Sequence, residues 1–78
     1  METKERFLMY AVMLSFYRDG VWSKPYTYKS SYPVNIDDKV VAPTGRWFSV
    51  GKVVACHKDY EFNDKIIYKH IHSVLENI

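Results

Sequence analysis

One long apolar run dominates the beginning of the chain. Residues 7–17 read FLMYAVMLSFY and are interrupted only by Ser15. The run is too short for a transmembrane helix, which needs about 20 residues. Its Tyr, Val and Phe residues favour a strand, whereas its Leu, Met and Ala residues favour a helix. Residues 18–20, Arg-Asp-Gly, are a hairpin-turn signal, and Val21 and Trp22 resume an extended pattern. The pattern therefore predicts a long strand, apolar on both faces, over residues 7–17.

The middle of the chain alternates short apolar stretches with turn residues. Pro25 limits strand pairing, and the alternation that follows it places Tyr26 and Tyr28 on one face of a short edge strand. Residues 40–42 then predict a brief strand that the Pro-Thr-Gly turn at residues 43–45 closes.

A longer alternating stretch, WFSVGKVVAC, covers residues 47–56. We expect one face of this strand to point into the core, and that face carries Phe48, Val50, Val54 and Cys56. Gly51 interrupts the stretch and predicts a bulge or a tight bend that lets a small sheet curl.

The segment 65–78 fits two periodicities. A helical stripe would contain Ile67, Ile71, Val74, Leu75 and Ile78. A strand would place Ile71, Ser73 and Leu75 on one face. We favour a strand over residues 70–75, because an open sheet edge would otherwise lack cover. The pattern as a whole predicts a mainly β fold, or an α+β fold if this segment is a short helix. Its architecture is a small curled sheet or SH3-like barrel of about five strands.

Composition limits the size and the environment of this fold. The 78 residues make one small domain, and 47% hydrophobic residues are too many for intrinsic disorder. Thirteen residues are aromatic, seven Tyr, four Phe and two Trp, and they can build a core in a chain that is short of buried surface. We expect four of them in the core: Phe7, Tyr10, Phe16 and Phe48. Cys56 is the single cysteine, which favours a reducing, cytoplasmic location.

Residues 26–54 resemble a known family. The segment YTYKSSYPVNIDDKVVAPTGRWFSVGKVV is similar to the opening segment of the 3′ DNA-binding domain of the primosomal helicase PriA, and to small phage and prophage proteins. The family has an aromatic-Asp-Tyr element, then Gly-Asp-x-Val-x-Val-Pro-Phe-Gly, then a Gly-x-Val strand. The matching positions are Tyr26, Tyr28, Asp38, Val40, Pro43, Gly45, Gly51 and Val53. The resemblance implies an SH3-like or split barrel that contacts nucleic acid.

Three positions depart from the family pattern. Thr27 stands where the family has the acidic residue that meets a 3′-terminal hydroxyl, Asp37 replaces the turn glycine, and Thr44 replaces the phenylalanine before Gly45. The resemblance therefore implies the fold more strongly than it implies 3′-end recognition.

Basic and aromatic side chains around the predicted edge strand and the 43–45 turn form the candidate site. They are Lys24, Tyr26, Tyr28, Lys29, Arg46, Trp47 and Lys52. Rings can stack on bases and cations can hold phosphates, so these residue types suit single-stranded DNA or RNA. The same residues are also typical of a half-buried core and of edge strands shielded from aggregation. The net charge of +2 supplies little long-range attraction, so binding must come from a local patch.

Two functions follow from this pattern. We expect a non-enzymatic binding module, a phage or prophage accessory protein that contacts nucleic acid. The alternative is a module that binds a host nucleic-acid-handling protein through an aromatic edge, where Trp22, Tyr32 and Trp47 border the strand 26–28.

Metal binding and catalysis find little support. The residues that could hold a metal are Cys56, His57, His70 and His72. Their spacing matches no compact zinc signature, so we expect no metal and no cofactor. A thiol on the core face of its strand would be inert, and adjacent Asp37 and Asp38 are typical of a turn. We therefore expect no enzymatic activity.

The long apolar strand also bears on partners. A strand at residues 7–17 that is apolar on both faces has more surface than a five-stranded domain covers, which predicts a homodimer through that strand. No apolar run is long enough to cross a bilayer, so we expect no membrane partner.

Overall fold

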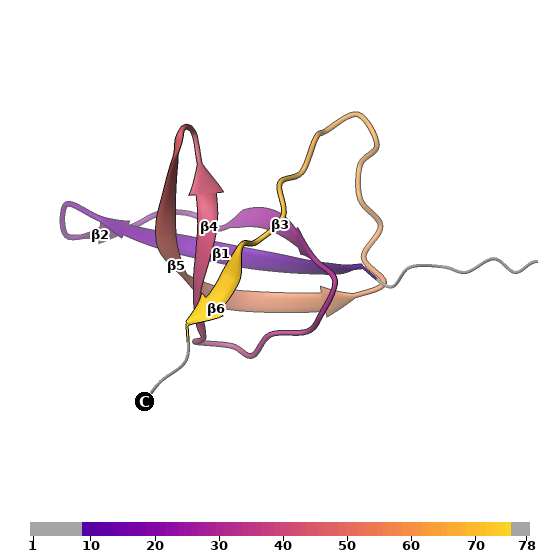
Figure 1. Cartoon of the computed structure of the whole chain (residues 1–78), viewed down its shortest axis with the longest axis horizontal. Coiled ribbons are helices and arrows are strands. Elements are labelled where there is room, and N and C mark those ends of the chain that lie inside the picture. The colour runs from indigo at the N-terminus through magenta and orange to yellow at the C-terminus, as the bar shows by residue number, and fades with distance from the viewer. Residues whose placement is uncertain (1–8, 76–78) are drawn as a thin grey trace, which may run out of the picture.

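The computed structural model describes residues 9–75, which form one curled antiparallel sheet (Figure 1). The strands are β1 (Tyr10–Arg18), β2 (Val21–Trp22), β3 (Tyr26–Ser30), β4 (Lys39–Thr44), β5 (Trp47–Lys58) and β6 (Ser73–Leu75). Their order is β2-β1-β5-β4-β6, and β3 also pairs with β1. The mainly β prediction is confirmed, with six strands in place of about five. Residues 9–75 contain no helix, and hence none that could span a membrane.

The predicted N-terminal strand and its hairpin are confirmed within the described residues. β1 pairs with β2 and β3 on one edge and with β5 on the other. Asp19 and Gly20 connect β1 to β2 with positive φ angles of 54° and 82°, as a type I′ turn requires. Phe7 and Leu8, the beginning of the predicted strand, lie outside the described residues, and so does the predicted core position of Phe7.

The core lies inside the curl of the sheet. Its buried residues are Val12, Leu14, Phe16, Tyr28, Val34, Val40, Ala42, Val53 and Ile71. Gly51 pairs with both Phe16 and Val40, and a Cβ at Gly51 would come within 2.8 Å of the Phe16 ring. The glycine is therefore needed for the close approach of a ring, and the strand does not bulge there.

The predicted core face of β5 is wrong for three of its four residues. Phe48, Val50 and Val54 are 60%, 50% and 37% exposed, whereas Val53 is fully buried. The register with β1 shifts between Met13 and Leu14, which pair with Ala55 and Val53, so that Val54 has no partner and forms the bulge.

The bulge also explains why the fourth residue of that face was predicted correctly. An extra residue reverses the alternation of a strand, so Cys56 returns to the core side beyond Val54 and packs against the core cluster. Two of the expected aromatic core residues also differ from prediction, since Phe48 is exposed and Tyr10 is only half-buried.

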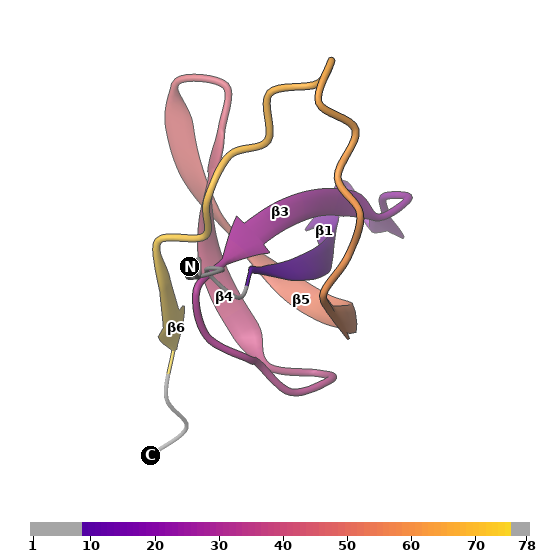
Figure 2. The same ribbon diagram turned by 90° about the vertical axis from the view of Figure 1, so that its right-hand side faces the viewer.

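The C-terminal segment contains the predicted strand, not a helix. β6 pairs with β4, and just before it the N–H of His72 donates to the Val41 carbonyl at 2.8 Å. Lys29 of β3 accepts from the N–H of Ile71 at 3.0 Å and donates to the Lys69 carbonyl at 2.9 Å. The segment 69–75 thus hydrogen-bonds to both β3 and β4, while the sheet itself stays curled and unclosed (Figure 2).

A series of contacts between aromatic rings holds the loop between β5 and β6 in place. Tyr60 stacks on His57 at 6.1 Å, and Phe62 lies 4.9 Å from both Tyr60 and Tyr68. The Lys29 ammonium lies over the Phe62 ring, 5.1 Å from its centroid. Lys29 and Phe62 are both half-buried, and a cation–π contact between such side chains contributes about 1 kcal/mol.

The middle of β1 lies between β3 and β5. Ala11 pairs with Lys29 on one side and with His57 on the other, and its side chain is fully buried. Ala11, Val12 and Leu14 are fully buried without a second chain, so within the described residues much of the apolar surface from which a homodimer was predicted is covered in the monomer, although Tyr17 is 60% exposed. The homodimer stays a prediction.

Candidate binding groove

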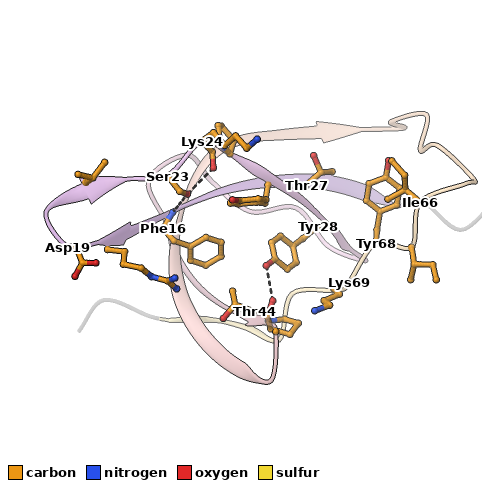
Figure 3. Close-up of a pocket in the computed structure, with 17 residues that line it drawn as sticks. Phe16, Asp19, Ser23, Lys24, Thr27, Tyr28, Thr44, Ile66, Tyr68 and Lys69 are labelled. Carbon is orange, nitrogen blue, oxygen red and sulfur yellow. Dashed lines mark hydrogen bonds between the residues drawn. The ribbon is translucent and has the colours of Figure 1, made fainter.

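An open groove of about 920 Å³ lies beside β3 and the end of β4 (Figure 3). The β1–β2 hairpin, β3, the turn between β4 and β5 and the segment 66–69 surround it. We call it the groove. It is lined by Phe16, Arg18, Asp19, Val21, Ser23, Lys24, Pro25, Tyr26, Thr27, Tyr28, Pro43, Thr44, Gly45, Ile66, Ile67, Tyr68 and Lys69.

Aromatic rings form the floor of the groove. The rings of Phe16 and Tyr28 meet edge to face with centroids 6.3 Å apart, and both residues are 7% exposed. The Tyr28 hydroxyl donates to the Pro43 carbonyl at 2.8 Å, which ties β3 to β4 (Figure 3). Burial raises the pKa of Tyr28, and the nearby Tyr26 raises it further. Tyr28 is therefore a neutral structural residue and not a free ring.

Tyr26 is the ring that the groove offers to a ligand. The β3 alternation places it on the same face as Tyr28, and its ring lies 6.3 Å from that of Phe16. It is 48% exposed. About half of the Tyr26 side chain is thus accessible to a ligand.

Serine side chains hold the groove rim in place. The Ser23 hydroxyl accepts from the N–H of Phe16 at 3.0 Å, and the Ser23 N–H donates to the Phe16 carbonyl at 2.8 Å. The Ser15 hydroxyl donates to the Ser23 carbonyl at 2.6 Å. These bonds fasten the connection between β2 and β3 to β1, and so fix the chain just before Lys24.

The rim is predominantly cationic. Arg18, Lys24 and Lys69 are exposed and come from three separate segments, and Asp19 is the one acid among the described residues that line the groove. Arg46 adds another exposed cation directly after the lining residue Gly45. The local charge is therefore more positive than the net charge of +2 suggests.

Five of the seven predicted site residues lie at or beside the groove. Lys24, Tyr26 and Tyr28 line it, although Tyr28 is buried in its floor. Arg46 lies in the adjoining β4–β5 turn, and Trp47, the first residue of β5, is 75% exposed.

The other two predicted residues are engaged elsewhere. The ammonium of Lys29 lies over the rings of Phe62 and Tyr68. Lys52 lies 4.7 Å from the Trp22 ring centroid, and its Nζ is 4.0 Å from a carboxylate oxygen of Asp37. The structure therefore does not gather all seven residues on one surface.

Sequence reasoning missed two rim cations. Arg18 carried a usable signal, because it stands at the base of the predicted hairpin, six residues before Lys24. No local pattern indicated Lys69, because its position at the groove depends on backbone hydrogen bonds between its segment and β3, which join residues forty positions apart in the chain.

The histidines and the cysteine lie in different surroundings. His57 stacks on Tyr60, and His72 lies 5.1 Å from the ring of Phe48. Residues 9–75 contain no group of three or more His, Cys, Asp or Glu that could hold a metal ion.

The adjacent carboxylates form a turn. Asp38 accepts from the N–H of Asn35 at 3.0 Å, and Asp37 has a positive φ of 76°. The N–H of Asp38 also donates to the Asn35 carbonyl at 3.1 Å, so the two bonds close a turn, which explains the pair as the connection that leads into β4.

Comparisons with protein-family models, with curated proteins and with solved structures find no match to this chain. The resemblance of residues 26–54 to the PriA domain therefore stays a prediction.

Proposed function

We propose that the protein is a non-enzymatic binding module that holds single-stranded nucleic acid in the groove. The observation that carries the proposal is one exposed ring, Tyr26, in a groove that Arg18, Lys24 and Lys69 also line. A base stacks on the ring, and the phosphates on either side of it meet the cations.

The types of residue in the groove determine the expected affinity for a single strand. Base stacking on one aromatic ring contributes about 1–3 kcal/mol. Three phosphate contacts on a single strand give a slope of about −2 for log K against log salt, because each contact contributes about −0.7. Affinity is thus expected to fall about 20-fold between 50 and 200 mM salt.

The remaining parts of the proposal rest on the sequence. A phage or prophage origin and an SH3-like architecture rest on the resemblance of residues 26–54. A cytoplasmic location rests on the single cysteine, Cys56.

Fluorescence anisotropy with labelled oligonucleotides tests the proposal. We expect dT10 and rU10 to bind at 50 mM salt and a ten-base-pair duplex to bind more weakly. Tyr26→Ala weakens binding about tenfold, which is the loss of one stacked base. Tyr32→Ala is the matched control, because Tyr32 is 42% exposed but lies outside the groove. The absence of binding at tens of micromolar protein, or an equal effect of both variants, contradicts the proposal.

A second candidate function is recognition of an extended peptide, and the edge of β3 favours it. Lys29 directs its N–H and C=O away from β1, toward residues 69 and 71. By the alternation of an antiparallel strand, Thr27 directs its own N–H and C=O to the same side, into the groove. Residues 9–75 provide no backbone partner there, so a partner strand could add to the sheet.

Thr27→Pro separates the two functions. Proline removes the outward N–H and leaves the groove cations and Tyr26 in place. A host protein that is captured by the wild type and lost with Thr27→Pro supports strand addition. Unchanged oligonucleotide binding by the same variant supports the nucleic-acid function.

A further inference from the structure

The tip of the β4–β5 hairpin projects beyond β1. β5 pairs with β4 along residues 47–52, but its pairs with β1 end where Phe16 meets Gly51. The end of β1 pairs with β2 instead. The projecting tip is visible at the top of Figure 1 and again after the 90° rotation of Figure 2. Among the described residues, the edge of residues 47–50 on the β1 side therefore has no neighbouring strand.

Phe48 directs its backbone hydrogen-bonding groups to this open edge. The N–H of Val53 donates to the Asp38 carbonyl at 3.0 Å, and the N–H of Asp37 donates to the Val53 carbonyl at 2.8 Å, so Val53 faces the β4 side of β5. These groups alternate between the two edges of a strand, and the register between β4 and β5 runs without a shift. Phe48 is five residues from Val53, an odd number, so its N–H and C=O point away from β4.

The open edge is apolar and lacks the usual protection against strand pairing. Phe48 is 60% exposed and Val50 is 50% exposed. Edge strands are commonly shielded by a charged side chain, a proline or a bulge. Residues 47–50, Trp-Phe-Ser-Val, contain no charge and no proline, and the bulge of β5 lies further along the strand, at Val54. An added strand would satisfy the backbone groups of Phe48 and cover its side chain.

We propose that this edge pairs with the same edge of a second copy of the chain. A two-fold axis at Phe48 places the two Phe48 residues opposite each other, where they exchange two backbone hydrogen bonds. Their rings then meet on one face of the joined sheet, and aromatic pairs across strands are stabilising. In the same register Arg46 of one copy approaches Val50 of the other, so no like charges face each other. The edge is therefore complementary to itself.

The exposed area determines the expected strength of this dimer. Trp47, on the opposite face of the strand from Phe48, is 75% exposed. Aromatic side chains bury about 150–250 Å² each, so Trp47 and Phe48 together offer about 300 Å² per copy. With Val50 and the strand backbone, two copies bury about 1,000 Å², the lower end for specific interfaces, and we expect a Kd of roughly 10–100 µM. The expected homodimer thus moves from residues 7–17 to β5.

Sedimentation equilibrium of the protein alone tests the proposal. We expect the full chain to be a monomer at about 1 µM and mainly a dimer at about 1 mM. Val50→Lys weakens the dimer about tenfold, because it sets a lysine beside Arg46 of the second copy twice in each dimer. Val54→Lys is the matched control. It makes the same change in the same strand, at a residue that is 37% exposed and lies outside the open edge, and it leaves the dimer unchanged.

A charge reversal tests the register. Added to Val50→Lys, Arg46→Glu recovers the lost tenfold, because two pairs of opposite charge replace the two pairs of like charge. A wild type that stays monomeric at about 1 mM, equal losses with Val50→Lys and Val54→Lys, or no recovery with Arg46→Glu overturns the proposal. Far-ultraviolet circular dichroism confirms that each variant folds. No nucleic acid is present, so the outcome does not depend on what the groove binds.

Discussion

The contact between Gly51 and Phe16 gives the sharpest stability prediction. Gly51 of β5 pairs with Phe16 of β1, and the Phe16 ring lies over the glycine, where a side chain would otherwise stand. Gly51→Ala adds a Cβ at 2.8 and 3.1 Å from two carbon atoms of that ring and at 3.2 Å from the Leu14 Cβ. Two neighbours must therefore move.

The magnitude follows from two opposed effects. Overpacking a filled core costs about 1–3 kcal/mol. Replacing glycine with alanine restricts the unfolded chain and recovers about 0.4–1 kcal/mol. The ring cannot swing freely to solvent because Phe16 is only 7% exposed. We expect a net destabilisation of about 0.5–2 kcal/mol, and a melting temperature lower by roughly 4–8 °C for each kcal/mol in a domain of this size.

Urea denaturation followed by circular dichroism measures the effect, with Phe16→Leu as the companion variant. Phe16→Leu is destabilising by itself because the core loses ring volume. In the Phe16→Leu background the smaller side chain leaves space for the Cβ of Gly51→Ala, so the destabilisation caused by Gly51→Ala falls to about zero. The double-mutant cycle then gives a coupling free energy of about 1 kcal/mol. A Gly51→Ala protein as stable as the wild type, or a cycle without coupling, would refute the account of this contact.

Three further predictions concern a turn, a floor residue and a cation. Asp37→Gly raises the free energy of unfolding by about 0.5–1 kcal/mol, because a positive φ of 76° suits glycine better than aspartate; an unchanged urea midpoint contradicts this. Tyr28→Phe lowers stability at pH 7 by about 1 kcal/mol through loss of the bond to the Pro43 carbonyl. Because folding raises the Tyr28 pKa above 10.0, the stability that the neutral Tyr28 side chain contributes is present below pH 10 and is lost as the pH rises through the raised pKa. The melting temperature should therefore fall less steeply between pH 8 and 11 in Tyr28→Phe than in the wild type. Lys29→Met lowers stability by about 1 kcal/mol through loss of the contact with Phe62, whereas Lys58→Met, at an exposed position, leaves the thermal melt unchanged.

Local pattern was sufficient for most of the strands. The apolar run, the Asp19–Gly20 turn and the alternation at Tyr26 each depend on neighbouring residues, and the structure has all three. The face of β5 was not predictable in this way. It depends on a bulge at Val54 that arises from pairing with a strand forty residues earlier, and one extra residue exchanges the two faces of a strand.

The groove was predictable only in part. Lys24 and Tyr26 are close in sequence, so the pattern placed them together correctly at the groove. Lys29 and Lys52 follow the same local pattern, yet their charges are directed at rings that other segments supply. Tertiary contacts of this kind are not encoded in the spacing of residues, and they also determine that Lys69 joins the rim.

A nuclear magnetic resonance titration tests the central claim most directly. The backbone amide signals of the ¹⁵N-labelled protein are followed while unlabelled dT10 is added at 50 mM salt. Binding in the groove predicts that the largest shifts fall on Arg18, Lys24, Tyr26 and Lys69, with little change at Ile36, which does not line the groove. Shifts that spare these residues and gather elsewhere, or a spectrum that does not change at millimolar oligonucleotide, would contradict the assignment of the groove as a nucleic-acid site.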